Sequence, residues 1–414
     1  MNILIFEPYA DREGHFGIYT SQIAQELSLR GHAVTVVTSH LDAKRYLSSE
    51  PRFRIIETGK GFFARSGGRS SRLRSALRGL GLILDNARVL LRLLRLCRNR
   101  RYDVIHFFDC EPVSTVVLLS ASSILFGLRP SPLFIVVHAP DPSYQGHGNI
   151  LYRLYSKGSR PMFKKLVSGF ATAITAHGTW RPGELEALLG LQDSPVPILP
   201  APYGTVVQEK PPSRTEARTS LGLSYDGIVL LFFGMLRRDK GVEILIEAMG
   251  RIRGDCRLLL AGTPFDWDAE GIRALIRAHR CEDRIVTDLR YIPEEATGRY
   301  FAAADALILP YRSHYMGAAG PLKTAFGFGL PVIASRVRDL AHHLEAAPIG
   351  IPVVPDSVES LQEAIEKFLA LTPSQRMDLS ENSRRMADSC SWEVVSKRFL
   401  EIYRPFVGSE GEAR

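Results

Sequence analysis

The chain is predicted to fold as an α/β protein with two Rossmann-like, doubly wound domains. Its 414 residues exceed the roughly 250–300 that a single hydrophobic core normally serves. Short apolar runs alternate with segments of helical spacing in both halves, which is typical of parallel sheets covered on both faces. Between the halves, around residues 194–225, the alternation lapses into prolines, serines and charged residues, which indicates a linker.

The first half contains five apolar runs that are typical of buried strands. The first is Asn2–Phe6, and a helical pattern over Gly17–Arg30 leads into the β-branched run Ala33–Thr38. The other three runs are Val104–Phe108, Leu133–His138 and Ala171–Ala176. Because no basic stretch precedes the first run, we interpret it as a core strand and not as a signal peptide.

In the second half the same alternation restarts. Strands are predicted at Gly227–Phe233, Arg257–Ala261, Ile285–Val286, Ala306–Pro310 and Pro331–Ser335, and helices at Gly241–Arg251, Ala269–His279, Glu294–Ala303 and after Gly320. We therefore predict an N-terminal domain at 1–205 and a C-terminal domain at 206–390, with a linker at about 206–225. A last helix at 391–406 is expected to cross back to the first domain, followed by a disordered tail at 407–414. Ligands of open α/β sheets bind beyond the carboxyl ends of the strands, so we expect a binding cleft between the two sheets.

Composition excludes several classes of protein. A content of 45% hydrophobic and 23% charged residues is ordinary for a soluble globular protein. The five cysteines are scattered and lack CxxC spacing, which argues against a disulfide framework or a zinc site and favours a reducing cytoplasm. The longest uncharged run, Pro112–Leu128, has 17 residues, short of the roughly 20 that a membrane span needs. We predict a buried helix there.

Positive charge is concentrated in one segment. From Gly61 to Arg101 there are eleven arginines, one aspartate and no lysine or glutamate, giving +10 where the whole chain carries +8. Arg88, Arg92 and Arg95 fall on one helical face with leucines opposite. An ordinary surface helix is one interpretation, but like charges at this spacing repel. An amphipathic helix held at an anionic membrane surface is the other. Nucleic acid is not expected as a partner, because aromatic residues are not interleaved with the arginines.

Two loops in the second half have the composition of a phosphate site. The first, Gly234–Gly241, follows a predicted strand and contains Arg237 and Lys240 just before a helix. Cations beside a helix start suit a diphosphate, because charge-assisted bonds add to those of the backbone amides. The second loop, Gly317–Gly320, is made of small residues and leads into a helix with Pro321 in its first turn. Each loop alone is also explained by a solvated turn or tight packing; together they predict a phosphate clamp.

Five motifs in register resemble the family-4 retaining glycosyltransferases, which have the GT-B fold. The motifs are the Gly14–Gly17 loop, Leu29–Val36, Gly234–Gly241, Ala304–Pro310 and Gly329–Ser335, and their order and spacing hold from residue 1 to about 405. The resemblance implies two facing Rossmann-like domains. It also implies transfer of a sugar from a nucleotide-diphosphate sugar to an acceptor.

The resemblance assigns roles to individual residues. Arg237 and Lys240 match the pair that neutralises the donor diphosphate as it leaves, and His138 matches a histidine that faces the transferred sugar. The other donor-binding positions are Tyr291, Gly317, Ala318, Ala319, Gly320, Leu322 and Thr324. The acceptor is expected near Gly14, His15, Gly17 and Tyr19, to which we add Asp109 because it follows the strand 104–108.

The chain departs from the family pattern at two positions. Members usually carry two glutamates separated by seven residues, and the aligned residues here are Met316 and Thr324. Neither side chain can make the carboxylate hydrogen bonds that hold the donor sugar and ribose. Asp266 and Asp268 form a DxD sequence, a metal-binding signature of a different glycosyltransferase fold, but their place ahead of a helix favours capping. We expect no essential metal and no cofactor besides the nucleotide sugar as co-substrate.

The predicted function is therefore that of a retaining glycosyltransferase. Its acceptor would be a glycan or a lipid-linked sugar in cell-surface polysaccharide or glycolipid synthesis, and it would act in the cytoplasm, on the inner face of the membrane. Two alternatives remain open at this point. One is a nucleotide-sugar epimerase with the same fold, and the other is a non-catalytic protein that binds nucleotide sugars or polyanions.

Overall fold

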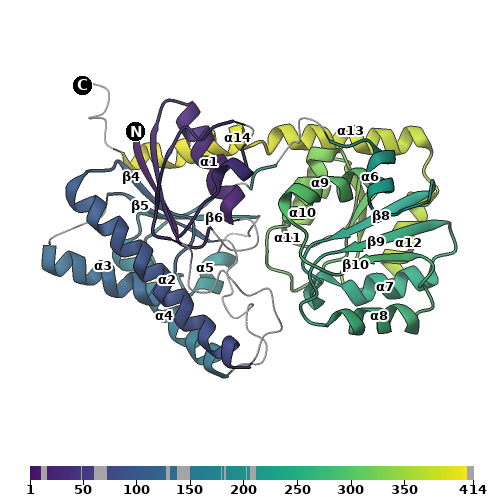
Figure 1. Ribbon diagram of the computed structural model, residues 1–414, viewed down its shortest axis with the longest axis horizontal. Coiled ribbons are helices and arrows are strands. Elements are labelled where there is room, and N and C mark those ends of the chain that lie inside the picture. Colours follow the sequence, from purple (N-terminus) through teal and green to yellow (C-terminus); the bar gives the residue numbers. More distant parts are fainter. Residues whose placement is uncertain are drawn as a thin grey trace. The chain divides into compact units, whose positions relative to one another are not determined.

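A computed structural model describes most of the chain. The described residues are 1–10, 16–47, 49–59, 72–126, 131–137, 150–178, 180, 183–201, 203–205 and 211–407, with the backbone alone described at 72–80, 125–126 and 150–156. The chain divides into two compact units (Figure 1). Unit 1 comprises Met1–Pro202 together with Val395–Arg414, and unit 2 comprises Tyr203–Val394.

Unit 1 is built on a seven-stranded parallel sheet in the order β3-β2-β1-β4-β5-β6-β7. Its strands are β1 (Asn2–Glu7), β2 (Ala33–Thr38), β3 (Arg54–Glu57), β4 (Val104–Phe107), β5 (Leu133–Val137), β6 (Ala173–Ala176) and β7 (Ile198–Pro200). The five strands predicted from apolar runs are the five central ones, as expected for strands buried on both faces. The two edge strands, β3 and β7, were not predicted, because each is short and partly exposed.

Helices cover both faces of this sheet. They are α1 (Phe16–Leu29), α2 (Arg72–Asn99), α3 (Pro112–Phe126), α4 (Ile150–Phe170), α5 (Glu184–Leu189) and α14 (Trp392–Tyr403), with short 3-10 turns at Ala43–Arg45 and Arg404–Phe406. Helices α2, α3 and α4 pack against one another as one layer (Figure 1). On α14, the Tyr403 hydroxyl lies 2.6 Å from Nδ1 of His106 on β4. None of the described helices combines the length and the apolar character that crossing a bilayer requires.

Helix α3 differs from the prediction of a buried helix. Its inward side is buried, with Val116 3% and Leu119 2% exposed, but Val117 is 58% and Ile124 82% exposed. The run is apolar on all sides, so its sequence carries no periodic signal that distinguishes the inner from the outer face. The prediction was wrong for this outer face, which leaves apolar side chains in contact with solvent.

Unit 2 contains a six-stranded parallel sheet in the order β10-β9-β8-β11-β12-β13. Its strands are β8 (Ile228–Phe233), β9 (Cys256–Ala261), β10 (Ile285–Asp288), β11 (Ala306–Leu309), β12 (Val332–Ser335) and β13 (Gly350–Val353). The helices are α6 (Arg214–Ser220), α7 (Val242–Arg251), α8 (Ala269–Ala278), α9 (Glu294–Ala303), α10 (Gly320–Phe328), α11 (Arg338–Ala346), α12 (Val358–Leu369) and α13 (Pro373–Ser389), with a 3-10 turn at Arg238–Lys240. Alternate residues of β8 face two cores: Val229 and Leu231 join one, and Leu230 and Phe232 join the other.

The predicted linker at 206–225 contains a folded element of unit 2. Helix α6 begins after Ser213, whose side chain accepts a hydrogen bond from the Glu216 backbone while the Glu216 carboxylate accepts one from the Ser213 backbone. Leu223, which follows α6, is 5% exposed in the core. The linker prediction was therefore wrong over this stretch. Prolines and charged residues hid a short helix whose Ser-x-x-Glu capping box was visible in the sequence.

Glycines let the loops at the carboxyl end of this sheet approach one another closely. Gly241 adopts a φ of +67°, and a Cβ built there would lie 2.0 Å from the Pro310 carbonyl oxygen. Gly262 adopts a φ of +145°, and its Cβ would lie 1.8 Å from the Gly234 oxygen. Only glycine tolerates such a combination of left-handed backbone and close contact. These positions fix the loops that follow β8, β9 and β11.

This geometry predicts a large effect of replacing Gly241 by alanine. Gly241→Ala is expected to lower the free energy of unfolding by about 2–4 kcal/mol, since both backbone strain and overlap with Pro310 must be relieved. Gly222 has the same φ of +67° but nothing within 4 Å of a built Cβ, so Gly222→Ala should cost only about 1 kcal/mol. Urea denaturation of both variants measures the difference. Equal losses would show that the Pro310 contact does not constrain the loop.

Candidate functional site

The loop after β8 holds a buried ion pair. Nε and Nη2 of Arg237 donate to the two carboxylate oxygens of Asp239 at 2.9 Å and 2.7 Å. The side chains are only 18% and 7% exposed. A two-point contact of this kind fixes the plane of the guanidinium group. Arg237 is therefore held in one orientation at the carboxyl end of the sheet, with its charge balanced by a neighbouring carboxylate.

Lys240, which ends the same 3-10 turn, is buried without a counter-charge of its own. The residue is 9% exposed, and its Nζ lies 5.7 Å from the centroid of the Tyr311 ring. Within the described part of the chain Lys240 makes no hydrogen bond and no ion pair. Burial, together with repulsion by Arg237, lowers the pKa of Lys240 to about 8. An unpaired buried ammonium group is costly, and this arrangement is typical of a site that an anion completes.

The amino end of α10 faces the same space. A Cβ built on Gly234 would lie 3.5 Å from Lys240 Nζ and 3.8 Å from Pro321 Cγ, so both groups flank the space beside Gly234. The helix begins after Ala319, which has no side chain able to cap it. The positive end of a helix dipole and a buried cation thus lie together, and both favour a phosphate or carboxylate.

Arg312 holds the two loops of this site together. Its backbone N–H donates to the Asp239 carbonyl at 2.9 Å, and its Nε donates to the Arg238 carbonyl at 3.1 Å. Its remaining guanidinium nitrogens bind Glu243 and Asp356. The loop after β11 is therefore tied to the turn that carries Arg237 and Lys240, and the charge of Arg312 is compensated within the protein.

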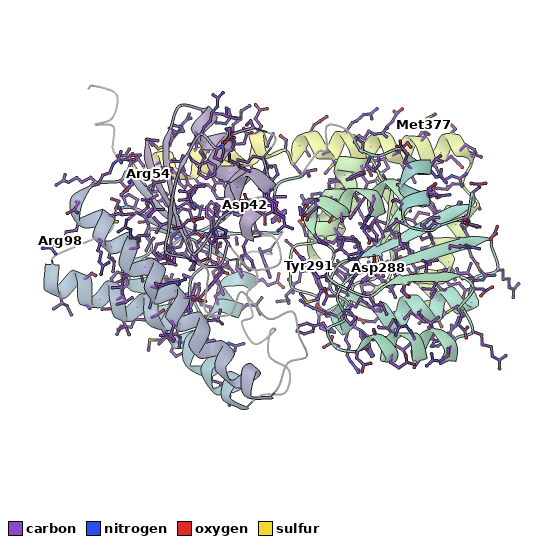
Figure 2. The ribbon with its side chains drawn as sticks, in the orientation of Figure 1. Asp42, Arg54, Arg98, Asp288, Tyr291 and Met377 are labelled. Carbon is purple, nitrogen blue, oxygen red and sulfur yellow. The ribbon has the colours of Figure 1, made fainter. Side chains whose placement is uncertain are left out.

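The other predicted donor-binding residues also lie in unit 2. Ala319 and Leu322 are each 1% exposed, so both residues are buried. The Thr324 hydroxyl donates to the Gly320 carbonyl at 3.4 Å, within α10. Tyr291 follows β10, is 38% exposed, and is labelled beside Asp288 in Figure 2. Gly317 and Ala318 lie in the partly exposed loop before α10. Their contacts with a donor remain a prediction.

Three of the residues predicted to contact the acceptor lie in the described part of unit 1. Gly17 is in α1, where a Cβ would lie 2.7 Å from the Tyr46 ring. Tyr19 is 1% exposed, and its ring centroid lies 5.0 Å from those of Phe108 and His177. Asp109 accepts a hydrogen bond from the Cys110 backbone at 2.7 Å. Gly14, His15 and His138 lie outside the described residues.

Both carboxylates of the DxD sequence make protein contacts. Asp268 caps α8 by accepting from the Gly271 N–H at 2.7 Å, which confirms the capping interpretation for this residue. Asp266 accepts from the Arg238 N–H at 2.6 Å, and the Arg238 guanidinium lies over the ring of Trp267. In the part of the chain that the structure describes, no three His, Cys, Asp or Glu side chains are grouped as a metal site would require.

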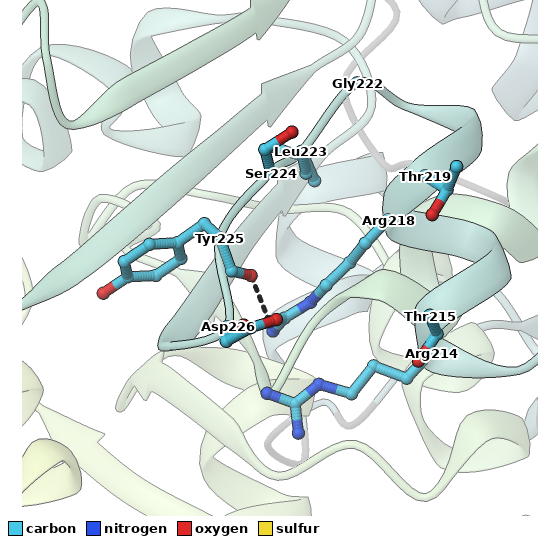
Figure 3. A pocket seen from close by; sticks show the side chains of 9 residues that line it. All are labelled: Arg214, Thr215, Arg218, Thr219, Gly222, Leu223, Ser224, Tyr225 and Asp226. Atoms are coloured by element: carbon cyan, nitrogen blue, oxygen red, sulfur yellow. Dashed lines mark hydrogen bonds between the residues drawn. The ribbon is translucent and has the colours of Figure 1, made fainter.

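An open pocket of about 770 Å³ lies elsewhere in unit 2, beside α6 (Figure 3). Its two arginines are engaged by the protein: Arg214 and Arg218 each approach a carboxylate oxygen of Asp305 at 2.9 Å. Arg218 also donates to the Tyr225 carbonyl at 2.7 Å (Figure 3). These bonds join α6 to the segments before β8 and β11, so we interpret the arginines as structural.

The fold of the protein matches that of known structures. The two parallel Rossmann-like sheets have the GT-B architecture of a sucrose-phosphate synthase from Thermosynechococcus elongatus, with a TM-score of 0.69 at 22% identity over 98% of this chain and 99% of that one. The Anabaena protein Alr3699/HepE, solved in complex with UDP, has a TM-score of 0.67 at 15% identity over 98% and 100% of the two chains.

Family models specify the class further. The model for "Glycosyl transferases group 1" matches residues 227–370, and that for a "Glycosyl transferase 4-like domain" matches residues 16–202. Because the two together cover most of the chain, the protein belongs to the group 1 glycosyltransferases. A D-inositol 3-phosphate glycosyltransferase from Saccharomonospora viridis is 29% identical over 205 residues, 47% of each protein. The chain spans about half the length of the first curated relatives it matches.

The burial of Lys240 predicts an unusual pH dependence of stability. The folded-state pKa of about 8 is below the ordinary value, so the unfolded chain binds more protons between about pH 8 and pH 10 and stability rises there. Lys240→Met should raise the free energy of unfolding at pH 7 by on the order of 2 kcal/mol. This advantage should shrink as the pH rises from about 8 to about 10. Urea unfolding at several pH values measures it; a constant difference would contradict a buried, unpaired ammonium.

Proposed function

We propose that the protein is a retaining glycosyltransferase that takes its sugar from a nucleotide-diphosphate donor. The observation that carries the proposal is the burial of Lys240 beside the amino end of α10, where it makes no hydrogen bond or ion pair with any described residue. A diphosphate bound there would supply the missing counter-charge and accept bonds from backbone N–H groups of the helix start. Membership of the group 1 glycosyltransferases supports a transferase reaction, and the UDP bound by the Anabaena structure supports a nucleotide donor.

The proposed chemistry needs stabilisation of the leaving group more than any other contribution. As the bond between the sugar C1 and the phosphate oxygen breaks, its electron pair passes to the diphosphate. The acceptor hydroxyl oxygen forms the new bond to C1, and its proton passes to the leaving phosphate. Lys240 and Arg237 would stabilise the negative charge that develops, which is the kind of preorganised electrostatic effect that lowers barriers most. We propose that these cations replace an essential metal ion.

The acceptor proposed is a glycan or lipid-linked sugar at the inner face of the cell membrane, in polysaccharide or glycolipid synthesis. This part of the proposal is supported by the exposed side chains of helices α2 and α4. Arg92 and Arg95 are exposed on α2, and Leu91, on the same helix, is 43% exposed among these charges. Helix α4 adds exposed Lys157, Arg160, Lys164 and Lys165. Cations mixed with exposed apolar side chains are typical of helices that lie in an anionic lipid surface.

A non-catalytic nucleotide-sugar binder is the second candidate. It is favoured by Met316 and Thr324, which stand where the family usually has glutamates. Such a protein would bind the donor through the same Lys240 site without turnover. A transfer assay separates the two candidates, because both predict donor binding and only the enzyme predicts product.

The enzyme proposal predicts that Lys240→Ala weakens donor binding and removes transfer. Loss of one charge-assisted contact should weaken binding of UDP or GDP by about 10- to 100-fold, and kcat/KM should fall by about 100- to 1,000-fold. Calorimetric titration with each nucleotide and a donor-consumption assay measure the two effects. Lys367→Ala, at an exposed position of α12, is the matched control. Unchanged nucleotide affinity in Lys240→Ala would remove the phosphate site from the proposal.

The membrane proposal predicts loss of lipid binding on neutralising α2. Arg92→Gln with Arg95→Gln should reduce binding to vesicles containing anionic lipid by about tenfold or more, since each surface cation contributes about 1 kcal/mol. Arg88 is left intact because its Nη2 donates to the Gly59 carbonyl at 2.8 Å. A control double variant, Arg253→Gln with Lys367→Gln, removes the same charge from exposed positions of unit 2. Equal vesicle binding by both double variants would contradict the assignment to α2.

A further inference from the structure

Tyr311 carries a buried hydroxyl group that makes no hydrogen bond with any described residue. The residue follows β11 and is fully buried, and its hydroxyl oxygen has no partner among the described atoms. A hydroxyl that leaves water on folding without gaining a partner is costly, because its hydrogen bonds to solvent are not replaced. Such groups are rare in folded proteins, so the surroundings of this hydroxyl indicate which partner it lacks.

The ring of Tyr311 packs against Tyr315 and lies close to Lys240. Its centroid is 4.3 Å from the centroid of the Tyr315 ring and 5.7 Å from Lys240 Nζ. An ammonium group at this distance is attracted to the electrons of an aromatic ring. Strand β11 is hydrogen-bonded to β8, so the loop of Tyr311 lies beside the loop of Lys240. The unsatisfied hydroxyl and the ammonium group without an ion pair therefore lie in the same part of unit 2.

Tyr315 shows that the same loop can satisfy a buried tyrosine. This residue is also buried, yet its hydroxyl donates to the Ala318 carbonyl at 3.2 Å. Among the described residues, the loop thus supplies an acceptor for one tyrosine and not for the other. The acceptor that Tyr311 lacks is consequently expected to come from a bound molecule.

The charges around Tyr311 favour an anion as that molecule. Burial raises the pKa of Tyr311 well above its ordinary value, Tyr315 and Asp239 raise it further, and Arg237 opposes them. The phenol is therefore protonated near neutral pH and is available as a donor. Asp239 already accepts two hydrogen bonds from Arg237. A hydroxyl donor that lies near two cations suits an oxygen atom of an anion, since hydrogen bonds to charged acceptors are the stronger ones.

We propose that the Tyr311 hydroxyl donates a hydrogen bond to an oxygen of the donor diphosphate, beside Lys240. The inference rests on the proposed function and adds to its site a binding residue that carries no charge. One ligand would then satisfy both the hydroxyl and the ammonium group. Because negative charge grows on the diphosphate as the sugar leaves, this hydrogen bond strengthens during transfer. Tyr311 gives up no proton, and the bonds made and broken at C1 are unchanged.

Removing the hydroxyl alone tests this proposal. Tyr311→Phe keeps the ring beside Lys240 and deletes a buried, unsatisfied group, so the melting temperature of the ligand-free protein should rise. The same variant should bind the nucleoside diphosphate about 10- to 100-fold more weakly, because it loses a hydrogen bond to a charged group. Calorimetric titration with UDP, GDP and ADP measures the affinity, and thermal unfolding without nucleotide measures the stability. A hydroxyl with a purely structural role would not make stability and affinity change in opposite directions.

Tyr403→Phe is the matched control. Tyr403 is also fully buried, but it lies in unit 1 and its hydroxyl is 2.6 Å from Nδ1 of His106. Loss of this satisfied hydrogen bond should lower the melting temperature and leave the affinity for nucleotide unchanged.

The outcomes separate the role of Tyr311 from the proposed function. Unchanged nucleotide affinity in Tyr311→Phe overturns the inference. So does a lower melting temperature or a failure to fold, which would assign the hydroxyl to the structure of the loop; weaker binding at an unchanged melting temperature supports it. If Lys240→Ala binds nucleotide as the wild type does, or if the wild type binds none of the three nucleotides, the proposed function fails as well. If Lys240→Ala loses binding and Tyr311→Phe keeps it, only the role of Tyr311 fails.

Discussion

A buried ammonium group that forms no ion pair with any described residue is the constraint on which the proposed site in unit 2 depends. Lys240 is held at the carboxyl end of the sheet by a turn that requires glycine at position 241. Its charge is disfavoured by burial and by Arg237, and its pKa is lowered accordingly. Natural proteins retain such a cost mainly where a ligand removes it. Under the proposed function, the rigid elements around Lys240 hold this unfavourable charge in the position where the donor diphosphate would bind.

The frame is rigid because its contacts are made by backbone atoms and paired charges. Gly234 and Gly262 bring the ends of β8 and β9 within contact distance, so these two loops cannot move apart without losing packing. Arg312 then joins the loop after β11 to the turn that carries Lys240, through the carbonyls of Arg238 and Asp239. Because a preorganised site loses little free energy on binding, this rigidity supports tight recognition of an anion.

From the sequence, the central strands and helices such as α1, α7 and α9 were predicted, because continuous apolar runs and helical periodicity arise directly from burial. Helices α4, α12 and α13 were not predicted. Secondary-structure elements were missed where their side chains are only partly buried, or where prolines and charged residues obscure the helical pattern. Edge strands β3 and β7 are short and half-exposed, so they lack a long apolar run. Helix α6 was hidden by prolines and charges although its Ser213–Glu216 capping box could have revealed it. In α3 the sequence is apolar on all sides, so the exposure of Ile124 to solvent could not be predicted from it.

For the site, the sequence identified residue types and their order but not their partners. Arg237 and Lys240 look equivalent in the motif, yet Arg237 is neutralised by Asp239 and Lys240 is not. Arg312 differs from Lys240 in the same way, because it binds two carboxylates, those of Glu243 and Asp356. No spacing rule reveals this, since pairing depends on loops from different strands meeting in space.

Whether a charged side chain is paired is therefore more informative about function than how many charged residues a segment contains. The net charge of +8 reflects mainly one arginine-rich segment in the first half of the chain, where exposed side chains are solvated and each contributes little. In unit 2 the balance is close, and most buried cations meet a carboxylate, as Arg218 meets Asp305 and Lys323 meets Asp339. Against that background Lys240, which is buried and forms no ion pair among the described residues, is a strong signal, since the low dielectric that makes its charge costly also strengthens its attraction to an anion. Under the proposed function the two regions have different partners: an anionic lipid surface for the exposed arginines of α2, and the diphosphate of the donor for Lys240.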